Sequence, residues 1–229
     1  MWASVDQIAE VMLGKMLDKE KHKSGSVLPY LRNINVRWGT IDTDDVLTMF
    51  FDKHELGRYG LEVGDVLVCE GGEPGRAAVC GAVHKQLKYQ KALHRVRLFG
   101  LYQPHLLAFY LEYLAKTGQL ERRFTGSTIK HFTRESFIEL PIPLPSFDEQ
   151  ENIVSIVMSA LDKAAMQDEV FAHSLKQSAA QRKNILKAAF SGQLVPQDPN
   201  DEPASVLLER IRAERLAFGT LAGKRRNSK

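Results

Sequence analysis

The residues best suited to chemistry in this sequence are basic and polar side chains that could contact a nucleic acid. Lysine, arginine, glutamine, tyrosine and histidine alternate through residues 84–97, and a second polar stretch follows a glycine at 127–131. Lysine and arginine neutralise phosphates, glutamine fits the edge of adenine, and arginine or lysine fits guanine. Gln86 and Gln90 are therefore candidates for adenine, and Arg95 or Lys85 for guanine. The full set of predicted DNA contacts is Arg76, Lys85, Gln86, Lys88, Tyr89, Gln90, Lys91, His94, Arg95, Ser127, Thr128, Lys130 and His131.

The distribution of charge supports an anionic partner, although the net charge is only +3. Residues 1–73 carry 8 Lys and Arg against 13 Asp and Glu, a net charge of −5. Residues 74–134 carry 11 against 2, a net charge of +9, and residues 135–229 carry 12 against 13. One basic window in a nearly neutral chain indicates a face that docks on a polyanion. The alternative is a solvated basic surface with no partner.

No catalytic or metal-binding motif is found, so we expect neither a catalytic centre nor a metal site. The sequence lacks the GxxxxGK(S/T) phosphate loop, the GxSxG nucleophile elbow and the HExxH zinc motif. Residues 71–75 are rich in glycine but precede a predicted strand, so we interpret them as a hairpin turn. Asp65 and Glu70 keep a metal-dependent nuclease open as an alternative. The histidines have no cysteine or carboxylate partners at ligand spacing.

The first part of the chain, residues 1–145, predicts an α+β domain of mixed strands and helices. A capping box at Ser4 and Gln7 predicts a helix of about ten residues, followed by a mobile loop over 14–26. Strands are predicted at 46–51 and 66–69, the latter paired with a returning strand at 76–79, and again at the end of 84–99. A helix is predicted at 104–116 and extended chain at 137–144.

The two cysteines and the N-terminus bear on the compartment. If the hairpin places Cys69 opposite Ala77, Cys80 lies opposite Val66, too far away for a disulfide. The first residues have no basic or apolar signal-peptide region, and no apolar run is long enough to span a membrane. We therefore expect a cytoplasmic protein with no membrane partner.

A long helix is predicted after the domain, over residues 146–191, because residues 147–190 contain neither proline nor glycine. Its apolar residues recur at heptad spacing, interrupted by Asp168, Ser178 and Arg182, and at about 1.5 Å per residue it would be roughly 65 Å long. Such a seam needs a partner helix. Residues 192–229 predict a rigid connector, a short helix at 204–218 and a disordered basic tail at 224–229. The predicted seam residues are Val154, Val157, Leu161, Ala164, Phe171, Leu175 and Ile185.

Several stretches resemble the specificity (S) subunits of type I restriction-modification systems. Residues 140–150, LPIPLPSFDEQ, resemble the junction at which a target recognition domain of this family meets its spacer helix. Residues 29–36, PYLRNINV, resemble an early strand motif of the family, and residues 64–68 with 75–79 resemble its central hairpin. Residues 186–198, LKAAFSGQLVPQD, resemble the exit of the spacer helix. The resemblance covers nearly the whole chain, from Trp2 to about Phe218.

The resemblance implies a non-catalytic subunit that reads one half of a bipartite target in double-stranded DNA. It also implies docking of methyltransferase (M) and motor-nuclease (R) subunits, which would supply the sites for S-adenosylmethionine, ATP and magnesium, while this chain holds no cofactor. S subunits usually have two recognition domains and two spacer helices, whereas this sequence has one of each and no internal repeat. It is therefore a half-length subunit that forms a homodimer through its long helix, or one half of a longer subunit. A coiled-coil scaffold that does not read DNA is the remaining alternative.

Overall fold

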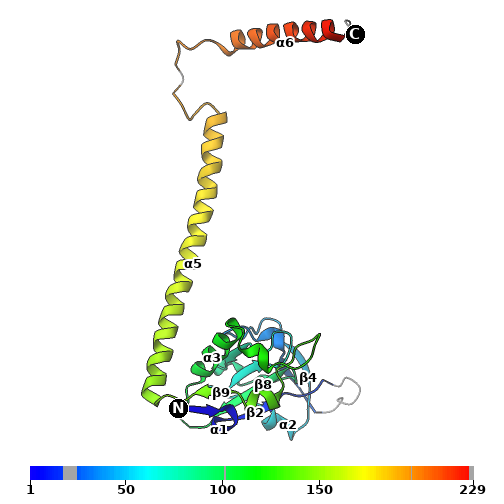
Figure 1. Cartoon of the computed structure of the whole chain (residues 1–229), viewed down its shortest axis with the longest axis vertical. Coiled ribbons are helices and arrows are strands. Elements are labelled where there is room, and N and C mark those ends of the chain that lie inside the picture. Colours follow the sequence, from blue (N-terminus) through cyan, green and yellow to red (C-terminus); the bar gives the residue numbers. More distant parts are fainter. Residues whose placement is uncertain (18–24, 101, 197, 227–229) are drawn as a thin grey trace. The chain divides into compact units, whose positions relative to one another are not determined.

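The computed structural model describes residues 1–17, 25–100, 102–196 and 198–226, with side chains as far as residue 218 (Figure 1). The chain forms two compact units, Met1–Asp162 and Lys163–Lys229. The first contains the strands, and the second contains the rest of a long helix and a further helix. The predicted class, an α+β domain followed by a long helix and a C-terminal helix, is confirmed. Along the described chain, none of the helices combines the length and apolar character needed to cross a bilayer.

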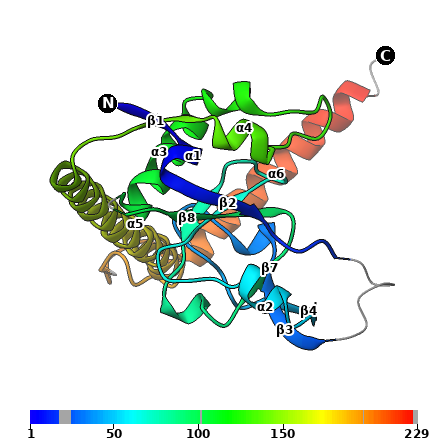
Figure 2. The same cartoon turned by 90° about the horizontal axis from the view of Figure 1, so that it is seen from below.

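The centre of the first unit is a four-stranded antiparallel sheet. Its order is β2 (Ala9–Leu13), β8 (Leu93–Leu98), β5 (Val66–Cys69) and β6 (Ala77–Val79), and Figure 2 shows β2 beside β8. Successive side chains of a strand point to opposite faces. Accordingly Val66 and Val68 enter one core cluster, whereas Leu67 and Cys69 enter another. The sheet is therefore buried on both faces.

Each face of this sheet has its own cover. Helix α3 (Pro104–Lys116) has its predicted bounds and packs Leu107 and Leu111 into the cluster of Val66 and Val68. On the other face lies a second sheet in the order β4 (Leu47–Phe51), β3 (Ser26–Leu31) and β7 (Lys88–Tyr89), seen together in Figure 2. Strand β3 is antiparallel to β4 and parallel to β7.

Short elements close the domain. Strand β1 (Trp2–Ser4) pairs with β9 (Pro141–Pro143), so the first residues lie beside the end of the domain. The remaining short elements are α1 (Val5–Ile8), η1 (Asn33–Asn35), α2 (Glu55–Arg58), η2 (Ala82–His84), η3 (Leu120–Arg123) and α4 (Arg134–Ile138).

The predicted first helix is wrong in length. Gln7 Oε1 does accept a hydrogen bond from the Ser4 backbone N–H at 2.9 Å, as in a capping box. The helix nevertheless ends at Ile8, because the chain becomes strand β2, in which Val11 pairs with Val96 of β8. Pairing with the sheet thus replaces helical bonds at Val11 and Met12. Most of the predicted mobile loop, residues 18–24, lies outside the described residues, and Ser26 begins β3.

The predicted hairpin is correct, but its register is shifted by one residue. Val68 lies opposite Ala77, and the Cys69 N–H donates to the Arg76 carbonyl at 2.8 Å. The turn needs glycine at residue 75, whose φ is 88°, because a Cβ there would lie 2.2 Å from Leu120 Cδ2. Both cysteines are buried free thiols, so the expectation of no disulfide holds.

The long helix α5 (Phe147–Phe190) begins and ends within one residue of the range predicted from the sequence, 146–191. It is followed by Gly192, with a φ of 70°, in the left-handed conformation typical of a residue just after a helix. Helix α6 (Ala204–Arg226) continues eight residues beyond the predicted end at 218. Residues 224–226 are thus helical instead of disordered, and residues 227–229 lie outside the described residues.

Candidate nucleic-acid interface

Three separate loops meet at one end of the central sheet. The Glu70 N–H donates to the Ala92 carbonyl at 2.9 Å, and the Phe132 N–H donates to the Glu70 carbonyl at 2.7 Å. These bonds place the residues just before β8, the turn after β5 and the segment after residue 130 side by side. At the opposite end of β5, Glu62, Asp65 and Gln103 line a separate hollow that also contacts Phe147 of α5.

The segment 125–131 forms a closed polar loop. Thr125 and His131 exchange two backbone hydrogen bonds of 2.8 and 2.9 Å, which close its base. Gly126 has a φ of 88°, and a Cβ there would lie 2.2 Å from the Ile129 carbonyl oxygen, so the loop requires glycine. The residues between the closing pair are all exposed to solvent. Gly72 and Pro74 line a neighbouring hollow of about 420 Å³ together with residues of this loop.

We define the loop face as Lys91 together with the exposed residues of the loop, Ser127, Thr128, Ile129, Lys130 and His131. It contains five of the predicted DNA contacts: Lys91, Ser127, Thr128, Lys130 and His131. Two cations, two hydroxyls and an imidazole beside a glycine turn suit phosphate contacts and hydrogen bonds to bases. The hydrogen bonds of Glu70 to Ala92 and Phe132 connect the backbone next to Lys91 with the backbone next to His131, although the two lie about 40 residues apart in the sequence.

Three other predicted DNA contacts, Tyr89, His94 and Arg95, are buried, so their predicted role is wrong. Tyr89 and His94 are 0% exposed, and Arg95 is 2% exposed. Arg95 donates to the carbonyls of Arg58 and Gly60 and forms an ion pair with Glu10. These side chains face inward because both faces of the central sheet are covered, so they support the fold instead of facing DNA.

Arg76 is a further structural cation. It is 8% exposed, donates to the Asn33 carbonyl at 2.7 Å and pairs with Glu73. Lys88 is half-buried and donates to the Leu56 carbonyl at 2.8 Å. Both side chains donate hydrogen bonds to backbone carbonyls of the domain. They therefore stabilise the fold, and their predicted role as DNA contacts is not supported.

The remaining predicted contacts lie on the segment that leads into β7 and β8. Lys85 and Gln86 are exposed immediately after η2, which follows the end of β6. Gln90 is half-buried and its backbone N–H donates to the Leu31 carbonyl at 3.0 Å. DNA contact by these three residues stays a prediction. The stretch 84–97 therefore does not supply DNA contacts along its whole length, because it passes from the surface into the core.

His94 gives a prediction for stability. Its Nε2 lies 2.7 Å from the Phe132 carbonyl, which only accepts, so Nε2 carries the proton of a neutral ring. Burial lowers the pKa of His94 from 6.5 to about 4. As the pH falls, His94 therefore becomes protonated in the unfolded chain before it does in the folded chain. The free energy of unfolding should fall by about 3 kcal/mol as the pH drops from 6.5 to 4.

Urea unfolding at several pH values measures this effect. The difference between the unchanged chain and His94→Gln, which keeps an amide donor for Phe132 but does not titrate, isolates the contribution of His94. The exposed His54→Gln serves as the control and should keep the pH dependence. Equal pH slopes for His94→Gln and the unchanged chain would contradict the prediction.

The acidic pair Asp65 and Glu70 is not a nuclease site. Both carboxylate oxygens of Asp65 accept bonds of 2.8 Å from Arg97, and one also accepts the Glu62 N–H. Strand β5 lies between the two acids, and at about 3.3 Å per residue it separates them by roughly 16 Å. A shared metal ion requires ligands far closer than that.

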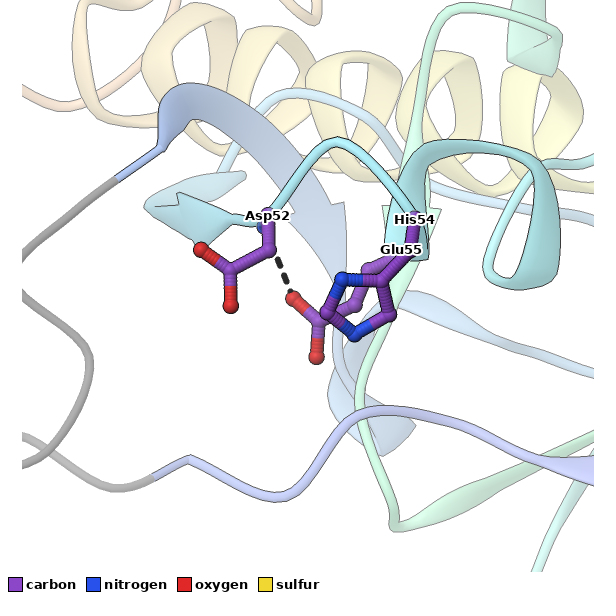
Figure 3. Close-up of side chains that lie close together, drawn as sticks. All are labelled: Asp52, His54 and Glu55. Atoms are coloured by element: carbon purple, nitrogen blue, oxygen red, sulfur yellow. Dashed lines mark hydrogen bonds between the residues drawn. The ribbon is translucent and has the colours of Figure 1, made fainter.

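Asp52, His54 and Glu55, three possible metal ligands, lie close together just after β4 (Figure 3). Their candidate ligand atoms all lie within 4.8 Å of one another. Glu55 Oε2 already accepts the Asp52 N–H at 2.9 Å and forms an ion pair with Lys15, whose side chain is 3% exposed. The Lys15 ammonium thus supplies the positive charge that a metal ion would bring, so the cluster fits a structural ion pair.

The comparison with known families decides the assignment. The family described as the type I restriction modification DNA specificity domain matches residues 2–169, which include the α+β domain and the first half of α5. The chain belongs to this family. As a specificity domain it is a recognition module and not an enzyme.

Curated relatives agree with the assignment. The specificity domain is 28% identical over 226 residues to the type I restriction enzyme EcoKI specificity subunit of Escherichia coli (strain K12), covering 93% of this chain and 49% of the relative. It is 32% identical over 152 residues to the EcoAI specificity subunit of Escherichia coli, covering 48% and 26%. The chain thus spans about half the length of the EcoKI subunit.

Solved structures show the same fold. A chain from a study of complex assembly and conformational transition of the type I R-M system has a TM-score of 0.67 at 19% identity, covering 85% of this chain and 46% of that one. The HsdS subunit from Thermoanaerobacter tengcongensis has a TM-score of 0.57 at 18% identity, covering 85% and 45%. In both comparisons the matched region covers about half of the other chain.

Two residues were missed from the sequence. Ile129 is 66% exposed within the loop face, although its apolar side chain does not predict a DNA contact. Gln150 is 1% exposed, although glutamine is usually a surface residue. Its position seven residues before Val157 places it in phase with the apolar seam, and that spacing was the available signal.

Proposed function

We propose that this specificity domain reads one half of a bipartite target in double-stranded DNA with its loop face. Membership of the specificity family carries the proposal. The loop face supports it, because Lys91 and Lys130 can hold phosphates while Ser127, Thr128 and His131 can reach base edges. The basic window 74–134 includes every residue of this face.

We infer that a second copy of the chain reads the other half of the bipartite DNA target. The specificity domain spans about half the length of the EcoKI subunit. The seam residues Leu161, Phe171 and Leu175 are 52%, 62% and 73% exposed, so a partner helix can cover them. Pairing through α5 would place two reading domains on one DNA, in agreement with a split target.

We propose that the methyltransferase and motor-nuclease subunits dock on this assembly. Similarity to a specificity subunit of a restriction enzyme supports that arrangement. S-adenosylmethionine, ATP and magnesium would then belong to the partner subunits, and this chain would hold no cofactor.

Selection from a randomised duplex library tests the reading function. The full chain, alone and with its methyltransferase subunit, should enrich one short motif and bind it at least about a hundredfold more tightly than unrelated DNA. Binding should weaken steeply with salt, because phosphate contacts release counterions. Self-association without any enriched motif in either preparation would overturn the proposal and favour the coiled-coil scaffold.

A further inference from the structure

Gln150 is a buried polar residue at the start of α5. Its Oε1 accepts the backbone N–H of Gln103 at 2.8 Å, and its Nε2 donates to the Pro145 carbonyl at 3.1 Å. Gln103 is the N-cap of α3, the helix that covers the central sheet. One amide thus joins the first turn of α5 to the start of α3 and to the chain before the helix.

These two bonds are directional. The amide oxygen only accepts and the amide nitrogen only donates, so the side chain fits its two backbone partners in one orientation. The α5 side of this contact is also packed, because Ile153 and Val154 lie against the core cluster that contains Leu107. The first two turns of α5 are therefore held on the domain by the two hydrogen bonds of the Gln150 side chain and by the packing of Ile153 and Val154. We call the pair of hydrogen bonds the Gln150 latch.

The latch lies on the same face of the helix as the seam. Gln150, Val154, Val157 and Leu161 follow one another at spacings of four, three and four residues, which is the heptad pattern. Val154, predicted as a seam residue, is half-buried against its own domain, whereas Leu161 is 52% exposed. The same helix face therefore packs against the α+β domain at Gln150 and Val154 and is exposed to solvent from Leu161 onward.

Resting on the function proposed above, we propose that Gln150 is a positioning residue that sets the rotational phase of α5 on the α+β domain. Because α5 is one continuous helix, a rotation of its first turn about the helix axis would rotate the seam by the same angle. The direction of the seam sets how two reading domains face the DNA. Gln150 thereby fixes the spacing between the two half-sites.

Spin labels on the full chain test the phase without DNA. Labels at Lys116→Cys on α3 and Ser159→Cys on α5 use exposed sites, while the native Cys69 and Cys80 are buried. The distance distribution between the labels should be narrow in the unchanged chain. Gln150→Met, which keeps the volume but loses both bonds, should broaden or shift it. An unchanged distribution would overturn the positioning role.

Duplexes with two inverted copies of the selected half-site test the consequence. Adding one base pair between the copies rotates the second by about 35°. The unchanged chain should prefer one spacer length by about tenfold over its neighbours, and Gln150→Met should reduce that preference to about twofold while still binding a single half-site. Retention of the full preference by Gln150→Met would contradict the proposal.

Two further variants separate positioning from folding. Glu149→Met changes an exposed residue of the same turn and should leave both readouts unchanged. Gln103→Pro removes the N–H that Gln150 accepts, at a φ of −76° that proline adopts, and should reproduce the effect of Gln150→Met. A failure to select any DNA motif would overturn the proposed function and the spacing role, whereas the label distances would still decide the phase.

Discussion

Phe171→Glu is expected to prevent the proposed pairing of two copies through α5 while the α+β domain stays folded. Phe171 is 62% exposed on α5 and lies near the middle of the seam that runs from Val154 to Ile185. In a symmetric antiparallel pair of helices, a residue at the middle lies close to its own copy. Two unpaired carboxylates would then enter an apolar contact, at a cost of about 3 kcal/mol or more, which weakens association by about a hundredfold.

Light scattering across a concentration series measures this change in mass. Ala180→Glu is the matched control, because residue 180 is exposed on the opposite face of the same helix and should leave the mass unchanged. Thermal unfolding of both variants should give the same transition for the α+β domain. A dimer mass for Phe171→Glu at low micromolar concentration would show that another surface joins the copies.

The double variant Lys91→Glu and Lys130→Glu is expected to weaken binding to the selected half-site by about a hundredfold. Both lysines belong to the loop face, and each reversal removes a phosphate contact and adds repulsion. The slope of log affinity against log salt should fall by about two, one for each lost contact. The self-association of the chain should not change, because neither lysine lies on α5.

Titration of the labelled half-site at several salt concentrations measures both quantities. Lys116→Glu is the control, since Lys116 is 71% exposed on α3 and lies outside the loop face. Lys85→Glu tests whether the exposed segment before β7 also contacts DNA, as its sequence predicts. Equal losses for Lys116→Glu and the double variant would mean that general charge, and not the loop face, binds the duplex.

The sequence by itself determined the features that depend on local pattern. A stretch of 44 residues without proline or glycine and with heptad spacing predicts one long helix, and α5 lies within one residue of the predicted bounds. Helix α3 and strand β5 are likewise found where proline, glycine and apolar runs placed them. The junction at residues 140–150 also identified the family, because its motif is contiguous in the sequence.

Only the tertiary structure decided which polar residues face solvent. Alternation in a strand places side chains on two faces but does not say whether both faces are covered. Because a second sheet covers one face and α3 the other, His94 and Arg95 are buried, although their sequence context resembles an exposed basic strand. The loop face and the Gln150 latch arise from contacts between distant segments, and no local pattern specifies such contacts.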